Sequence, residues 1–195
     1  MALSRNEAVE MLGEISRTEQ RSAELREYAF SSPHFVLWGV AWVIGYTGSY
    51  LLPNYGFVGA INWLWFAITI AGVTGSHVIT RRQIRDRNPD QQAVGRAKAL
   101  RIGMTWLAVW FFVVATFFVM KPVNPMAAGA WIPLIVALLY AIVGIWKGVR
   151  FLYAGIAVAV LTLGGWLYLR EFFLLWMAFV GGGALMLDGL WLKKA

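Results

Sequence analysis

Two histidines and one aspartate are the residues in this chain whose chemistry suits a metal ion or a haem: His34, His77 and Asp188. Imidazole and carboxylate groups ligate transition metals, and two imidazoles from neighbouring helices can hold a haem iron from both sides. These residues come from three separate stretches and share no local spacing motif. The alternative is that they are polar residues at a membrane interface. Asp188 is then expected to pair with one of three bases, Lys147, Arg150 or Lys193.

Ser76 and His77 are adjacent and raise the question of nucleophilic catalysis. On a helix, adjacent side chains point about 100° apart, so they cannot form a nucleophile and base pair by themselves. No Gly-x-Ser-x-Gly sequence surrounds Ser76, and residues 81–101 contain no P-loop or other phosphate cradle. The chain also has no Cys, which excludes disulfides and thiolate chemistry. We therefore expect a protein without catalytic residues.

Aromatic pairs and a run of glycines are the residues with which the chain could bind an uncharged or cationic organic ligand. Two Trp residues one turn apart can build an aromatic pocket, and successive glycines inside a span can line a substrate site at a kink or an unwound stretch. The alternatives are Trp side chains that face lipid or pack between helices, and glycines that let helix backbones approach closely. The residues are Trp38, Trp42, Trp106, Trp110, Gly181, Gly182 and Gly183.

The elements that must position these residues are long apolar helices. Hydrophobic residues make up 59% of the 195 residues, charged residues make up 14%, and the mean hydropathy is +0.62. A helix needs roughly 20 mainly apolar residues to cross a bilayer. Six windows of about this length predict an all-α, polytopic integral membrane protein with six transmembrane helices. The windows cover residues 33–52, 57–80, 102–120, 128–146, 151–169 and 172–192.

The positive charges predict the orientation of these spans. Fifteen of the 17 Lys and Arg residues lie on the side of the N-terminus, and only Lys121 and Arg170 lie on the other side. Short segments rich in Lys and Arg stay in the cytoplasm. Both termini are therefore expected in the cytoplasm, with the protein in a bacterial-type inner membrane. The chain divides into a cytoplasmic region, residues 1–32, and a transmembrane domain, residues 33–192.

A basic cytoplasmic loop, from Arg81 to Arg101, joins the second and third predicted spans. It carries a net charge of +5 and is expected to extend both spans as helices, with a break at Asn88–Pro89. Basic clusters next to a membrane attract anionic lipid headgroups. Because no aromatic residues are interleaved with the bases, this loop is not expected to bind nucleic acid.

The N-terminal region is predicted to form an amphipathic helix over residues 4–30. Three apolar residues share one helix face: Met11, Leu12 and Ile15. The segment contains four Arg and six Glu residues, a net charge of −2 that argues against anchoring to a membrane surface. The apolar face therefore needs a protein surface. We expect this helix either to fold back on the 81–101 loop of its own chain or to dock on a partner.

The ionisable residues lie near the ends of the predicted spans, which argues against an ion-coupled transporter or a proton pump. Together with the unpartnered N-terminal face, this predicts a non-enzymatic subunit or regulatory partner in an inner-membrane assembly, built with another membrane protein or as a homo-oligomer. One alternative is a small transporter or channel for an uncharged or cationic organic molecule. Another is a haem-binding redox protein that uses His34 and His77. No other cofactor is expected.

Overall fold

The chain folds into long antiparallel helices. The computed structural model describes residues 5–85, 89–120 and 125–194, and these contain helices and turns but no strand. The all-α class predicted from the sequence is confirmed. The longest helices are α1 (Arg5–Leu51), α2 (Ala60–Arg85), α3 (Pro89–Met120), α4 (Pro125–Lys147) and α5 (Val149–Tyr168). The last apolar segment consists of α6 (Phe173–Trp176), a π-helical turn η3 (Met177–Gly181) and α7 (Gly182–Lys193).

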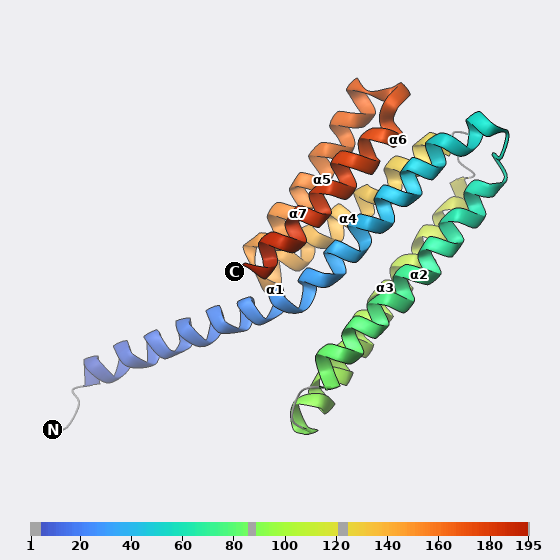
Figure 1. Cartoon of the computed structure of the whole chain (residues 1–195). Helices are drawn as coiled ribbons and strands as arrows, with labels where there is room; N and C mark the ends of the chain where they lie inside the picture. The colour runs from blue at the N-terminus through green and yellow to red at the C-terminus, as the bar shows by residue number, and fades with distance from the viewer. Residues whose placement is uncertain (1–4, 86–88, 121–124, 195) are drawn as a thin grey trace.

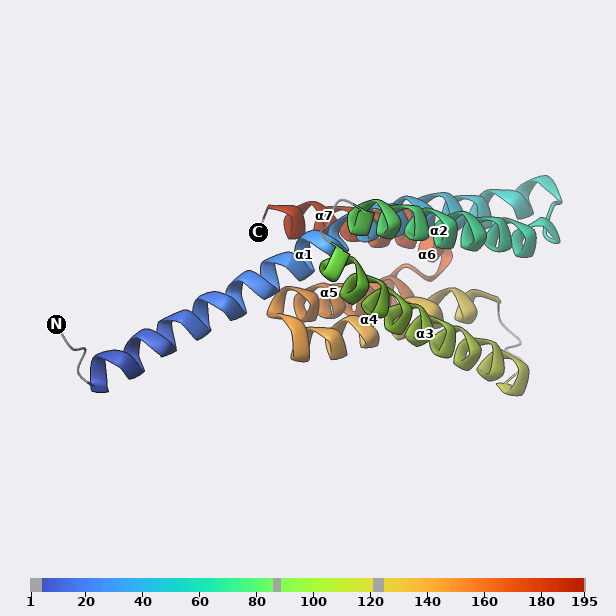
Figure 2. The same ribbon diagram turned by 90° about the horizontal axis from the view of Figure 1, so that it is seen from below.

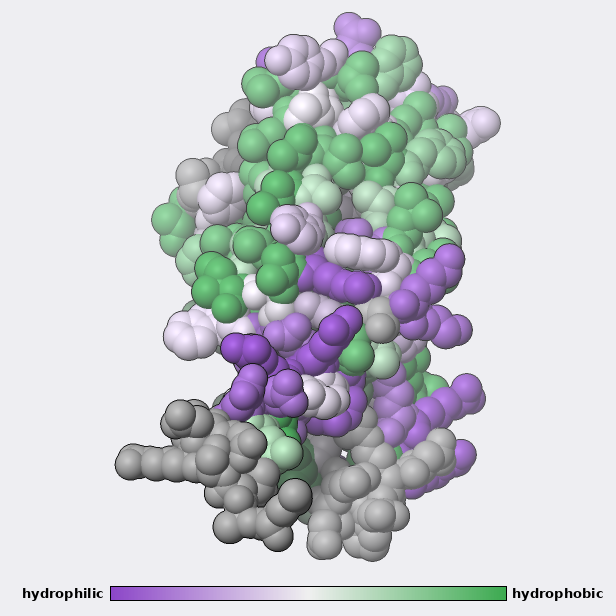
Figure 3. Space-filling view, turned by 90° about the vertical axis from the view of Figure 1, so that its left-hand side faces the viewer, coloured by the Kyte–Doolittle hydropathy of each residue, from purple (hydrophilic) through white to green (hydrophobic). Residues whose placement is uncertain are grey.

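Within the described residues, six helical segments are long and apolar enough to cross a membrane. Each of them overlaps one of the predicted windows, so the chain is a multi-pass membrane protein whose apolar helices contact the lipid bilayer. On the face drawn in Figure 3, hydrophobic residues cover the upper part, and hydrophilic residues gather below them. The segments are Glu10–Tyr55, Ala60–Arg85, Gln92–Val119, Ala127–Lys147, Val149–Tyr168 and Arg170–Lys193.

The helices are packed to very different degrees. Helix α1 packs closely on α7, and α4 packs closely on α5 (Figure 1). Helix α2 leans on α1, whereas α3 contacts mainly α2 and buries none of its apolar stretch (Figure 2). Most of the side chains with the least exposure come from α1, α5 and the α6–α7 segment. They include Phe35, Trp42, Tyr46, Phe151, Phe173, Met177, Leu185 and Leu192.

Helix α1 is continuous from Arg5 to Leu51 although it contains Pro33. The helix expected over residues 4–30 and the span expected over residues 33–52 are therefore one element. A proline inside a helix removes one backbone hydrogen bond and bends the helix without necessarily ending it. Figure 1 shows α1 bending between the part that packs in the bundle and the part that projects from it.

One end of the bundle collects basic residues. Helices α2, α4 and α7 all finish there, and the N-terminal part of α1 leaves from the same end (Figure 1). The α5–α6 connection, with Arg170, lies at the opposite end. The bases at the end where α2, α4 and α7 finish include Arg81, Arg82, Arg85, Lys147, Arg150 and Lys193.

A tyrosine of α1 makes a proline inside α4 tolerable. Pro133 has no N–H, so the carbonyl oxygen of Gly129, four residues before it, loses its usual helical donor. The hydroxyl of Tyr46 donates a hydrogen bond of 2.7 Å to this oxygen. Inside a bilayer, a neighbouring helix must supply such a partner because water cannot. Tyr46 thereby ties α1 to α4.

We expect Tyr46→Phe to lower the free energy of unfolding by about 1–3 kcal/mol, since the Gly129 carbonyl would lose its donor. Thermal denaturation in detergent measures this loss. In a Pro133→Ala background the helix regains its own donor, so the same tyrosine substitution should cost clearly less. Equal costs in the two backgrounds would contradict this role of Tyr46.

Candidate functional site

The projecting part of α1 exposes an apolar face to solvent. Residues 10–21 are all exposed, and the exposed fractions of Met11, Leu12 and Ile15 are 51%, 65% and 55%. Figure 1 shows this part of α1 projecting away from the other helices. We name these three residues the docking face. Large apolar side chains grouped on an exposed helix are typical of a binding surface.

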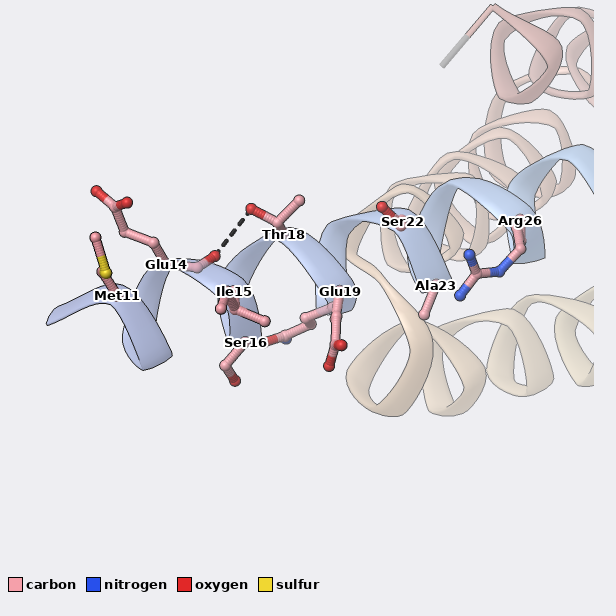
Figure 4. A pocket seen from close by; sticks show the side chains of 10 residues that line it. Met11, Glu14, Ile15, Ser16, Thr18, Glu19, Ser22, Ala23 and Arg26 are labelled. Atoms are coloured by element: carbon pink, nitrogen blue, oxygen red, sulfur yellow. Dashed lines mark hydrogen bonds between the residues drawn. The ribbon is translucent and has the colours of Figure 1, made fainter. Parts of the chain in front are cut away.

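A shallow hollow continues the docking face toward the bundle. Met11 and Ile15 line it at one end, and Ser22, Ala23 and Arg26 line it at the other (Figure 4). Between them lie Glu14, Ser16, Thr18, Glu19 and Gln20. The hydroxyl of Thr18 donates to the carbonyl oxygen of Glu14 at 2.9 Å, which turns that hydroxyl back onto its own helix. The apolar part of this surface is thus confined to the far end of the helix.

The expectation that this helix folds back on its own basic loop is wrong for the part that the structure describes. The α2–α3 hairpin meets α1 near Phe30, where the side-chain amide of Gln83 donates to the Phe30 carbonyl oxygen at 3.1 Å. The docking face lies well beyond this contact and remains exposed. The physical reason is the continuity of α1, which carries Met11 away from the bundle instead of allowing a turn.

Aromatic and basic side chains fasten α1 where it leaves the bundle. Arg150 stacks its guanidinium over the rings of Tyr28 and Trp191, 5.4 and 4.7 Å from their centroids. It also donates to the Trp191 carbonyl oxygen at 3.2 Å. Gly148 adopts a φ of 143°, and a Cβ at this position would collide with the Tyr28 hydroxyl. This turn therefore requires glycine. Sequence reasoning missed this cluster because no local pattern joins residues so far apart in the chain.

Asp188 does not pair with any of the three bases expected for it. Lys147 instead forms an ion pair with Glu27 at 3.7 Å, and Arg150 binds the Trp191 carbonyl oxygen as described. Within the described residues, Oδ2 of Asp188 is buried and has no hydrogen-bond partner. The bases sit at the helix ends, where the aromatic rings and Glu27 compete for them, while Asp188 lies inside α7.

We expect Asp188→Asn to raise the free energy of unfolding by about 1 kcal/mol, because burying one oxygen of a charged carboxylate without a partner is costly. Denaturation in the same detergent for both proteins gives the difference. A fall in stability would contradict this expectation, since it would mean that the carboxylate makes a favourable contact that the amide cannot replace.

The two histidines have different surroundings. Nε2 of His34 lies 3.1 Å from Oγ1 of Thr80, and its Nδ1 lies 3.2 Å from the Phe30 carbonyl oxygen. His34 thus joins α1 to α2, whereas His77 is exposed on α2. Across residues 5–85, 89–120 and 125–194, no group of three or more His, Asp or Glu side chains could hold a metal ion. The haem alternative stays a prediction that this geometry does not test.

The hydroxyl oxygen of Ser76 is buried in the same region and has no hydrogen-bond partner among the residues described. Ser76 lies one turn before Thr80 on α2. Thr80, Gln83 and His34 complete a polar seam between α1 and α2. Polar side chains facing a neighbouring helix stabilise helix pairs in lipid, so this seam has a structural role.

The two tryptophan pairs are not alike. Trp42 is buried and meets Tyr46 edge-on, with 5.9 Å between ring centroids. Trp38 covers Gly72 of α2. Trp106 and Trp110, by contrast, are exposed on α3. The first pair packs between helices, and the second lies on a helix surface that lipid can cover.

The glycine run serves packing at two of its three positions. A Cβ on Gly182 would lie 2.9 Å from the Gly39 carbonyl oxygen, and one on Gly181 would lie 2.9 Å from the methyl carbon of Met177. No atom outside its own helix turn lies within 4 Å of a Cβ on Gly183. The segment is not unwound. Gly181 ends the π-helical turn η3, and Gly182 and Gly183 begin α7. Such a turn is a local widening of the helix often found at functional positions.

A scan of protein-family models, a search of curated proteins and a search of solved structures found no match to this chain.

Proposed function

We propose that this chain is a non-enzymatic, multi-pass protein of a bacterial-type inner membrane that acts as a subunit or regulatory partner in a membrane assembly. Both termini lie in the cytoplasm. The excess of bases at the end where α1 emerges supports this orientation, because fifteen of the 17 Lys and Arg residues belong to that side. The docking face then projects into the cytoplasm.

The observation that carries the proposal is the exposure of the docking face. Met11, Leu12 and Ile15 are each more than half exposed on the part of α1 that projects from the bundle. Ordering a helix that contributes nothing to the core brings no gain from burial, so a partner is needed to exclude water from these side chains. A helix laid with its apolar face in a partner's groove is a recurrent mode of recognition.

Helix α1 also supports a regulatory role. The same helix that carries the docking face packs along α7, where the hydroxyl of Ser32 donates to the Gly189 carbonyl oxygen at 2.7 Å. Farther along, Gly39 meets Gly182. A partner that tilts the projecting part would therefore act on the α1–α7 contact inside the bilayer, because both belong to one continuous helix.

Site-specific photo-crosslinking in native membranes tests the proposal. A photoreactive residue at Ile15 should give protein adducts, whereas the same residue at Gly13 should give few. Gly13 is exposed but lies about 200° around the helix from Ile15. Adducts at both positions to the same extent, or at neither, would contradict a specific docking face.

A further inference from the structure

The docking face lies beyond the reach of the basic loop of its own chain. Met11 precedes Phe30 by nineteen residues in a continuous helix, which places it about 28 Å farther along the helix. Helix α2 ends at Arg85, two residues after Gln83 contacts Phe30. The described part of the α2–α3 hairpin therefore lies near the base of the projecting helix. It leaves the docking face uncovered.

The start of α3 presents a second uncovered face. Inside the hairpin, Gly95 packs on Ile84, and both residues are buried. Val94, Ala97 and Leu100 are exposed, with exposed fractions of 71% for Val94 and 66% for Leu100. We name these three residues the hairpin face. Like the docking face, it holds apolar side chains that no other described helix covers.

The two faces carry opposite charges at their edges. Glu14 and Glu19 are exposed beside the docking face, whereas Arg96 and Arg101 are exposed beside the hairpin face. The segments as a whole have net charges of −2 for residues 4–30 and +5 for residues 81–101. Both faces lie at the same end of the bundle (Figure 1). Two copies in one membrane would thus present complementary surfaces on the same side of it.

We propose that the docking face of one copy binds the hairpin face of a second copy, and that the exchange is reciprocal. Apolar side chains meet in the middle of the contact, and acidic residues of α1 face arginines of the partner's hairpin. The projecting helix is long enough for this, since residues 10–29 span about 30 Å. A two-fold axis uses both faces of both copies and leaves neither uncovered. This inference rests on the proposed function and names a second copy as the partner.

Thiol crosslinking tests the contact on a clean background, because the chain contains no Cys. Two differently tagged copies are expressed together in the same membrane, one with Ile15→Cys and the other with Val94→Cys, and treated with a short bismaleimide. We expect a product that carries both tags. The matched control, Gly13→Cys with Val94→Cys, should give a several-fold lower yield. Equal yields, or no product with both tags, would overturn the inference.

Charge reversal provides a second readout. Glu14→Lys with Glu19→Lys in the first copy should lower the crosslinking yield by about tenfold. Adding Arg96→Glu and Arg101→Glu to the second copy should restore most of it. Failure to restore would contradict the assigned pairing of charges.

Two further outcomes would distinguish a second copy from a different protein or a lipid as the partner. If photo-crosslinks from Ile15 join a different protein and no product with both tags forms, the proposed function stands and the second copy is rejected as partner. If Val94→Cys is protected from maleimide only in vesicles with anionic lipid, and not by a second copy, the hairpin binds headgroups and the inference fails.

Discussion

Gly182→Leu is expected to lower the free energy of unfolding by more than about 3 kcal/mol, because it forces α1 and α7 apart. Even the first carbon of the new side chain would lie 2.9 Å from the Gly39 carbonyl oxygen and 2.9 Å from a methyl of Val43. A carbonyl oxygen belongs to the backbone and cannot turn away as a side chain can. Close contact of small residues is what holds helices together in lipid. Few other interactions could therefore hold α1 on α7 if this contact were lost. Denaturation in detergent or bicelles gives the change in free energy.

Gly183→Leu is the matched control for this prediction. It adds the same side chain one residue later, where no atom outside its own helix turn lies within 4 Å of the new Cβ. We expect it to change the free energy of unfolding by less than about 1 kcal/mol. Equal stabilities of the two variants would contradict the close approach of α1 and α7 at Gly182.

The double substitution Met11→Ser with Ile15→Ser should weaken binding to the partner by about 3–4 kcal/mol, which corresponds to several hundredfold in affinity. Each residue would bury a large apolar side chain in the complex, and both are more than half exposed without it. Association of two differently tagged copies in lipid nanodiscs measures the effect. Affinity for any other protein captured by photo-crosslinking from Ile15 can be measured in the same way.

The same double variant should fold normally, because its residues contribute nothing to the core. Its helix content and its stability toward heat should equal those of the unmodified protein within about 0.5 kcal/mol. Gly13→Ser, on the opposite side of the helix, should leave binding unchanged. Unchanged binding by the double variant would remove the docking face from the contact.

The overall class could be predicted because transmembrane helices are marked by composition over many residues. The windows predicted at 128–146 and 172–192 lie inside the apolar segments Ala127–Lys147 and Arg170–Lys193. The window at 33–52 predicted a separate helix, whereas α1 continues back to Arg5. A boundary was expected because the residues change from charged to apolar there and because Pro33 is present. Helical backbone hydrogen bonds continue through such a change in side chains, and a single proline bends the helix without ending it.

The candidate site was predictable only in part, because sequence shows helix periodicity but not the packing of distant helices. Met11, Leu12 and Ile15 share a face because of helical periodicity, which sequence shows directly. Whether that face is covered depends on where distant helices lie. Asp188 shows the same limit, since one of the bases expected to pair with it, Lys147, forms an ion pair with Glu27 instead. Pro133 revealed that the Gly129 carbonyl needs a donor, but only the fold shows that Tyr46 supplies it.

We propose that a partner in the membrane covers the projecting part of α1. Amide hydrogen exchange over residues 10–26 tests it most directly, because an isolated exposed helix opens easily and exchanges fast. We predict slow exchange in native membranes, fast exchange in the dilute protein extracted in detergent, and fast exchange in the Met11→Ser with Ile15→Ser variant in both settings. Equally fast exchange of the unmodified protein in native membranes and in dilute detergent would contradict the claim.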